Sequence, residues 1–150
     1  MDPRHRGWVR ASVLLFVVSS VLVSFGLGEY ESSEPLGVST GVFTEEQADQ
    51  GAEAFARHCA GCHGAALEGG FGPRLVPLDP FAYDGESLSK PFAFMRTQMP
   101  FDAPGSLEDD VYLVILAFIL RENGYPSGDE PLSADDDALA QFVLDDPAAE

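Results

Sequence analysis

Basic side chains are scarce in this chain of 150 residues. Eight lysines and arginines stand against 25 aspartates and glutamates, and Lys90 is the only lysine. A formal net charge of −17 excludes the basic surface that nucleic-acid binding requires, so we expect no nucleic-acid partner. The acidic surface has two interpretations: it keeps the protein soluble, or it steers the protein toward a basic patch on a partner.

Long apolar runs are also rare. Residues 11–28 carry no charged side chain and follow a segment that contains Arg4, Arg6 and Arg10. This order is typical of a secretory signal peptide, and the run is also just long enough for a membrane anchor. Arginines before the run and acids after it place the body of the protein outside the cytoplasm in both cases. We therefore predict a signal peptide or membrane anchor at residues 1–28. The expected location is the periplasm or the outer face of the cytoplasmic membrane.

The chain has only two cysteines, and both lie in the sequence CAGCH at residues 59–63. A disulfide between them would close a very short loop and would stabilise the fold little. A zinc site needs four convergent ligands, and the cysteines and histidines of residues 58–63 are too close in sequence to surround one ion. A thioredoxin-like motif usually opens a helix after a strand, whereas here a helical pattern leads into Cys59.

The pentapeptide matches C-x-x-C-H, the attachment signal for c-type haem. Two thiols one helical turn apart can each form a thioether with a haem vinyl group, and His63 then lies beneath the iron as an axial ligand. We therefore predict one covalently bound haem c that is attached to Cys59 and Cys62 and ligated by His63. In bacteria this attachment takes place outside the cytoplasm, which agrees with the apolar segment.

Caps and breakers in the sequence predict an all-α fold in which a few helices and long loops surround the haem. Thr44 and Gln47 form a capping box that begins the first helix. Gly51 lies on the apolar face of this helix, which indicates that another helix crosses close to its backbone. Residues 64–105 are rich in glycine and proline and show no strand alternation. Within them we expect short helices near Ser87–Lys90 and Phe92–Gln98.

A second long helix is expected after this loop region, with Ser106 as its cap. Residues 111–120 are apolar without interruption, so this helix needs burial on several sides. Ser133 is expected to begin a last short helix that runs to Val143. The predicted domains are a linker at residues 29–43, a haem domain at residues 44–126 and an acidic C-terminal extension at residues 127–150.

The second axial ligand must come from later in the chain, and Met95 and Met99 are the candidates. Met99 precedes Pro100, which favours an extended backbone from which a thioether can reach the iron. Met95 suits the role of a flexible core residue better. The outer ring nitrogen of His63 needs a fixed acceptor, and the carbonyl of Pro73 is the best candidate. The Gly72-Pro73 pair is nearly as consistent with an ordinary turn.

These residues resemble class I, monohaem cytochromes c over residues 42–126. In that family a glycine and a phenylalanine precede the haem motif at four-residue steps, and a Gly-Pro turn with a leucine follows it. The corresponding residues here are Gly51, Phe55, Cys59, Gly72, Pro73, Leu75, the pair Met99-Pro100, and Phe118 on the last helix. The resemblance implies that the Pro73 carbonyl holds His63, that Leu75 packs on the haem and that Phe118 packs against Gly51.

The resemblance also implies a function. A haem iron with both axial positions filled is typical of a single-electron carrier and not of an enzyme. The expected partners are redox proteins that act as electron donor and acceptor. A membrane tether is possible. The stretches GVFTEEQADQG and MPFDAPGSLEDD are similar to cytochromes associated with periplasmic quinoprotein dehydrogenases. A haem subunit fixed in such a complex is one alternative, and an open-site haem sensor or enzyme is another if Met99 is not a ligand. A haem-free binding module is the remaining alternative. Arg74, Tyr83 and Arg96 are the candidate partners of the haem propionates.

Overall fold

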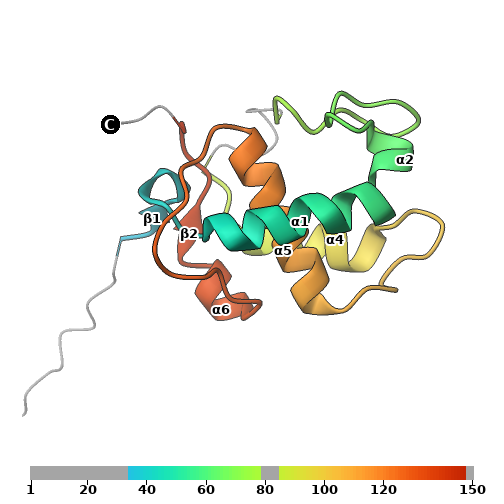
Figure 1. Cartoon of the computed structure of the whole chain (residues 1–150). Coiled ribbons are helices and arrows are strands. Elements are labelled where there is room, and N and C mark those ends of the chain that lie inside the picture. The colour runs from blue at the N-terminus through green and yellow to red at the C-terminus, as the bar shows by residue number, and fades with distance from the viewer. Residues whose placement is uncertain (1–33, 79–84, 148–150) are drawn as a thin grey trace, which may run out of the picture. The chain divides into compact units, whose positions relative to one another are not determined.

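The computed structural model describes residues 34–78 and 85–147. The predicted signal peptide or anchor, the start of the predicted linker and Tyr83 lie outside these ranges. Figure 1 shows the order of the elements along the chain. They are β1 (Leu36–Gly37), a 3-10 turn η1 (Val38–Thr40), α1 (Glu45–His58), α2 (Ala60–His63), α4 (Ser89–Gln98), α5 (Asp109–Glu122), α6 (Asp136–Leu139) and β2 (Phe142–Val143). Within these ranges the fold is helical, as predicted, with one pair of two-residue parallel strands.

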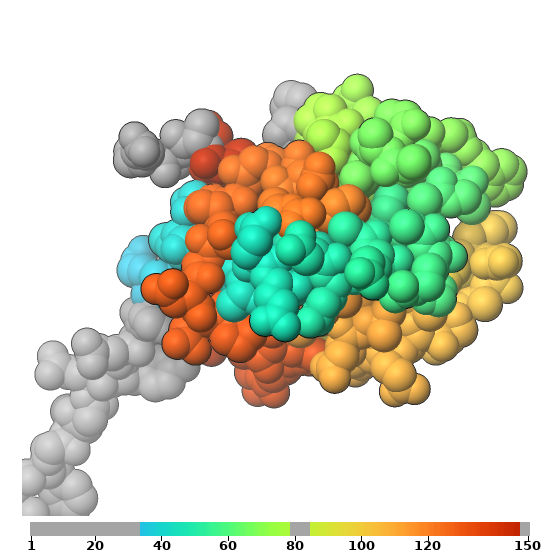
Figure 2. All heavy atoms as spheres, viewed as in Figure 1, coloured from blue at the N-terminus to red at the C-terminus, as the bar shows by residue number. Residues whose placement is uncertain are grey.

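Helix α1 begins with the predicted capping box. The Thr44 hydroxyl accepts from the Gln47 amide at 3.2 Å, and the Gln47 side chain accepts from the Thr44 amide at 3.3 Å. The Gln47 side chain also bonds both backbone groups of Leu132, at 2.8 and 2.9 Å. One side chain therefore starts α1 and ties it to the C-terminal segment, which lies beside α1 in Figure 2.

Helices α1 and α5 cross at Gly51. A Cβ atom at this position would collide with the backbone carbonyl of Val114 and with Cβ of Phe118. The rings of Phe55 and Phe118 pack with centroids 5.4 Å apart. Because only a glycine leaves room for this contact, the predicted close approach of a second helix is confirmed.

Helix α5 begins later than predicted. Its N-cap is Glu108, whose side chain makes no capping hydrogen bond, and Ser106 lies in the preceding loop with its amide bonded to the Ala103 carbonyl at 3.2 Å. The predicted Ser106 cap was therefore wrong, because Ser106 is part of a hydrogen-bonded turn with Ala103 that ends before the helix starts. The apolar stretch is buried on several sides as expected, with all of residues 115–120 buried.

Helix α4 is one continuous helix, where the sequence predicted two short ones. Pro91 is its third residue. A proline in the first turn of a helix costs little, because the amides of that turn have no partner within the helix. Pro91 therefore does not interrupt the segment from Ser89 to Gln98.

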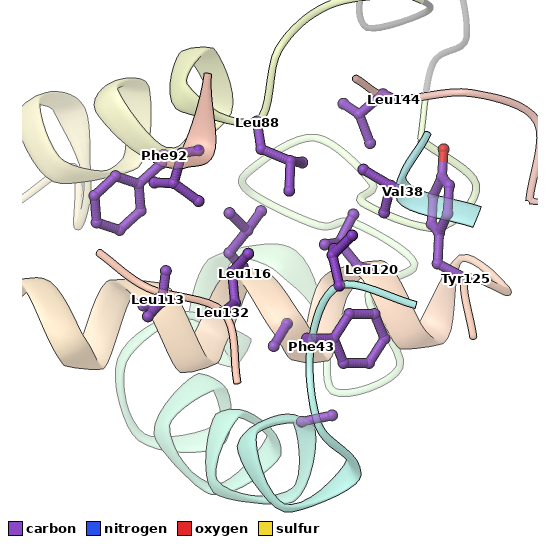
Figure 3. Close-up of a cluster of buried hydrophobic side chains, with 14 of the residues drawn as sticks. Val38, Phe43, Leu88, Phe92, Leu113, Leu116, Leu120, Tyr125, Leu132 and Leu144 are labelled. Atoms are coloured by element: carbon purple, nitrogen blue, oxygen red, sulfur yellow. The ribbon is translucent and has the colours of Figure 1, made fainter. Parts of the chain in front are cut away.

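Two clusters of buried apolar residues form the core. The first, shown in Figure 3, combines α4 and α5 with segments that the sequence assigned to the linker and to the C-terminal extension. Val38 and Phe43 are fully buried in it, as is Leu139, and Leu132 and Leu144 are nearly so. The apolar core therefore includes residues on both sides of the predicted domain at residues 44–126. The reason is that the parallel strands β1 and β2 hold the two flanking segments together.

The C-terminal segment differs from the prediction in detail as well. Asp135 caps α6 in place of Ser133, since its carboxylate accepts from the Ala138 amide at 2.8 Å. The helix ends at Leu139, and Phe142–Val143 pairs with Leu36–Gly37 as β2. Among the helices in the described ranges, none is both long and apolar enough to cross a membrane.

Candidate haem-binding site

The two cysteines lie on one helical turn at the end of α1. Cys59 joins α1 to α2, and its carbonyl accepts from the amides of Cys62 and His63 at 3.1 and 3.0 Å. Both thiols are free; Cys59 is half-buried and Cys62 is exposed. Burial, with a smaller contribution from Cys62, raises the pKa of Cys59 to about 11. The turn presents two free thiols at the spacing that two thioether bonds require.

The segment that follows α2 folds back over this turn. The Gly72 amide donates to the Cys62 carbonyl at 2.8 Å, and the Gly69 amide donates to the His63 carbonyl at 2.7 Å. Leu75 donates to the carbonyl of Leu67 at 2.8 Å, and Leu67 is 1% exposed. The loop thus closes on itself and brings its Gly-Pro pair next to the His63 ring.

The His63 ring is oriented by Pro73. Its Nδ1 lies 2.7 Å from the Pro73 carbonyl oxygen, the contact that the sequence predicted. A carbonyl oxygen can only accept, so Nδ1 carries the proton and donates it. The neutral ring then has its lone pair on Nε2, which is the form that binds a metal.

Gly72 also constrains the orientation of the His63 ring. A Cβ atom at this position would lie 2.9 to 3.2 Å from three atoms of the His63 imidazole. The backbone of Gly72 therefore lies against the ring, and a side chain here would push the ring away. The loop after α2 thus holds His63 by a hydrogen bond on one edge and by backbone contact on one face.

Met99 lies at the C-terminal end of α4. Its backbone is extended, with φ −123° and ψ 154°, as the following Pro100 predicts. Its amide donates to the Met95 carbonyl at 3.0 Å, and its side chain is partly exposed. Met95 instead packs against both clusters of the core, which agrees with the core role expected for it.

The segments that carry the candidate ligands converge on the second core cluster. Its buried residues are Ala54, Phe55, Leu67, Ile115, Phe118 and Ile119. Half-buried apolar side chains from the haem motif, the following loop, α4 and the loop before α5 pack against it; they include Cys59, Leu75, Val76, Met95 and Leu107. Figure 2 shows the loops after α2 and after α4 reaching the surface at the same end of α1. Free thiols, an oriented imidazole and an apolar lining fit a covalently attached haem.

Two positions that bear on this site were missed by the sequence analysis. The Asn123 side chain donates to the Leu75 carbonyl at 2.9 Å and accepts from the Leu78 amide at 2.7 Å, so it holds the loop to the end of α5. The Tyr112 hydroxyl donates to the Met99 carbonyl at 2.6 Å. Asn123 was overlooked because Gly124 beside it indicated only the end of a helix. Tyr112 was overlooked because it lies within an apolar run that indicated only burial.

The structure distinguishes between Arg96 and Arg74 as candidate partners of the haem propionates. Arg96 pairs with Asp109 and Asp136, each at 3.2 Å, and hydrogen bonding to Asp136 raises its pKa further. Its guanidinium is therefore already engaged. Arg74 is exposed and has no ion pair within the described part of the chain. Of the two arginines, Arg74 is therefore the one without an ion pair in the described ranges, and it follows Pro73 directly.

Residues 46–119 match the family of subunit III of cbb3-type cytochrome c oxidases. Cytochrome c-551 of Bacillus subtilis is 30% identical over 112 residues, which cover 73% of this chain and 94% of that protein. The chain belongs to the cytochrome c family. Covalently bound haem c is therefore its cofactor and electron transfer its role.

Two further similarities are to parts of larger proteins. A thiosulfate dehydrogenase of Psychrobacter arcticus is 29% identical over 105 residues, which cover 58% of this chain and 32% of that protein. The crystal structure of the sulfane dehydrogenase SoxCD from Paracoccus pantotrophus superposes with a TM-score of 0.51 at 25% identity, covering 73% of this chain and 64% of the other. This cytochrome thus spans about a third of the length of the thiosulfate dehydrogenase that it matches.

Proposed function

We propose that this cytochrome is an exported carrier of single electrons, which it accepts from a dehydrogenase or respiratory complex and delivers to a terminal acceptor. In this proposal Cys59 and Cys62 would hold the haem, His63 and Met99 would ligate its iron, and Leu75 would pack on it. The bound haem supplies a one-electron ferric–ferrous couple. The chain itself turns over no substrate, because neither axial position is left for one.

The hydrogen bond between His63 and Pro73 is the observation that supports this proposal most directly. At 2.7 Å it leaves Nε2 of His63 as a metal-binding nitrogen on the same turn as both free thiols. A structural Cys-x-x-Cys motif would not need a neighbouring histidine held in this tautomer. The backbone of Gly72 against the ring gives the same indication, because it keeps the imidazole in one orientation.

Met99 is proposed as the second ligand because its backbone is extended and anchored while its side chain is free of the core cluster that holds Met95. A thioether is a soft, neutral ligand, and it favours ferrous iron and raises the reduction potential. The apolar residues of the second core cluster act in the same direction, because they disfavour the additional positive charge of the ferric state.

Met99→Ala tests this assignment. We expect the variant to keep its covalent haem and to lose the weak long-wavelength absorption band of methionine-ligated ferric haem. Its reduction potential should fall, as measured by spectroelectrochemistry. Met95→Leu is the matched control, since it conserves volume in the core and should leave both the band and the potential in place. An unaltered band in Met99→Ala would assign the ligand to another methionine, and absence of the band from the parent protein would support an open-site sensor or enzyme.

A second candidate function is that of a haem subunit fixed in a dehydrogenase complex. The similarity to SoxCD and to a thiosulfate dehydrogenase favours it; a quinoprotein dehydrogenase is the partner that the sequence motifs suggested. Purification from native membrane and soluble fractions separates the two functions. Stoichiometric co-purification of a dehydrogenase would support the fixed subunit, whereas recovery of the cytochrome alone would support the carrier. The same fractions show whether the first 28 residues act as a signal or as an anchor.

A further inference from the structure

The carbonyl of Met99 accepts two hydrogen bonds in this structure. The Tyr112 hydroxyl donates to it at 2.6 Å, and the Gly105 amide donates to it at 3.2 Å. Two donors on one carbonyl fix the direction of the backbone from which the Met99 side chain extends. One of these donors belongs to the ligand loop itself, and the other belongs to helix α5.

Tyr112 is a rigid donor. It lies in the first turns of α5, is 1% exposed and belongs to the first core cluster. Its hydroxyl also lies 3.4 Å from the Leu107 amide, which donates to it. The Tyr112 hydroxyl therefore bonds the backbone at both ends of the loop between α4 and α5. It bonds Met99 at the start of this loop and Leu107 near its end.

The loop between these ends has little other support from the core. All of residues 101–106 are exposed, and Phe101 is 75% exposed. Its further backbone bonds, from Ala103 to Pro100 and from Ser106 to Ala103, are local. The bond to Tyr112 is therefore the contact that joins the start of this loop to a buried helix.

We propose that Tyr112 is a positioning residue for Met99: its hydroxyl holds the ligand loop so that the thioether stays on the iron. This inference rests on the proposed function, in which Met99 is the second axial ligand. Tyr112 does not touch the metal in this scheme. It acts through the backbone, by making the state with Met99 displaced less favourable.

The test is Tyr112→Phe in the holoprotein, which keeps the buried ring and removes only the hydroxyl. Imidazole is the probe, titrated against the ferric protein, because it competes with methionine for the iron. We expect imidazole to bind about two- to tenfold more tightly to the variant, the range that follows from losing one hydrogen bond. The long-wavelength band of methionine ligation should weaken in parallel.

Tyr125→Phe is the matched control. Tyr125 is 8% exposed, and its hydroxyl donates to the Asp145 carbonyl at 2.6 Å, a bond of the same kind and length. We expect this variant to lose thermal stability without any change in imidazole affinity. Equal imidazole affinities for Tyr112→Phe, Tyr125→Phe and the parent protein would overturn the proposal.

Failure of the inference and failure of the proposed function give different results. If the parent protein lacks the methionine band, Met99 is not a ligand and the proposed function itself fails. If the band is present in the parent and undiminished in Tyr112→Phe, only the positioning role fails. Hydrogen exchange on the parent holoprotein needs no variant: the Gly105 amide should exchange slowly, and exchange at the rate of an open loop would contradict the proposal.

Discussion

At the scale of single residues, the site is governed by which atom of His63 is free. The Pro73 carbonyl accepts a hydrogen bond from Nδ1, and Gly72 lies against the ring, so Nε2 is the nitrogen available to the proposed iron. Such outer contacts set the orientation and basicity of a metal ligand. In the proposed site the two cysteines attach the haem, and these backbone groups set the orientation of the imidazole.

Gly72→Ala is expected to displace the His63 ring. The added methyl group has no space beside three ring atoms, so the ring or the loop must move at a cost of about 1–3 kcal/mol. A weakened bond from Nδ1 to Pro73 makes the imidazole less basic, so the ferric state is stabilised less and the reduction potential should rise. Voltammetry and thermal melting of the holoprotein measure both effects.

Gly61→Ala is the control for this experiment, because it lies in the same motif and has no atom near the position of a Cβ. It should attach haem and show the potential of the parent protein. Identical behaviour of the two variants would mean that the contact between Gly72 and the ring has no role in the holoprotein.

At the scale of elements, helix α5 connects the two core clusters. Some of its residues pack with the flanking segments in the first cluster, and Ile115, Phe118 and Ile119 pack with α1 in the second. The crossing with α1 at Gly51 sets how closely the two helices approach. Arg121 strengthens the same contact, since it bonds Glu45 and Asp49 on α1, each at 2.8 Å.

Gly51→Ala should destabilise the protein although alanine is the better helix former. Helix propensity alone would stabilise the variant by about 1 kcal/mol. The collision with the Val114 carbonyl should outweigh this gain and give a net loss of about 1–3 kcal/mol in chemical denaturation. Ala56→Gly, at an exposed position of α1, measures the propensity effect separately. A more stable Gly51→Ala variant would show that the helices do not cross there.

At the scale of the whole molecule, segments on both sides of the predicted domain complete the core. Leu132, Leu139 and Leu144 are buried against α5 and against residues of the 38–43 segment. Each buried leucine contributes about 1.5–3 kcal/mol, which is large beside a total stability of about 5–15 kcal/mol. The acidic C-terminal segment therefore has a packing role that its charge alone does not indicate.

Removal of residues 129–150 should leave a protein that is mostly unfolded or that melts far below the parent. The physical reason is the exposure of the first core cluster, and circular dichroism during heating measures it. The double variant Asp129→Asn and Glu130→Gln changes charge at exposed positions of the same segment and should melt close to the parent. Equal stability of the truncated and full-length proteins would contradict this packing role.

The net charge is also a property of the whole molecule. In the described ranges Arg57, Lys90, Arg96 and Arg121 are all paired with acids, so the surface potential is set by the excess carboxylates. Steering by this charge is screened beyond a distance of about 10 Å at 0.1 M salt. The electron-transfer rate with cationic hexaammineruthenium should therefore fall as salt rises, and the rate with anionic ferricyanide should rise. Flat salt profiles for both reagents would leave solubility as the role of the charge.

The sequence by itself determined the features that depend on residues within a few positions of one another. The CAGCH motif, the capping box of Thr44 and Gln47, and the extended backbone of Met99 before Pro100 are of this kind, because each results from local sterics or local hydrogen bonds. The cap of α5 was misplaced because the prediction used a local rule alone. Serine is a common N-cap, but the Ser106 amide bonds the Ala103 carbonyl within the loop that precedes the helix.

Only the tertiary structure decided which distant groups meet. It brings the Pro73 carbonyl to His63, where the sequence left an ordinary turn as an alternative, and it brings Tyr112 to Met99 and Asn123 to Leu75. It also draws the flanking segments into the core. These contacts join residues that are ten to more than a hundred positions apart, as between Ser39 and Asp145. Such pairs form because burial and hydrogen bonding are satisfied by the whole chain at once, and no local pattern records them.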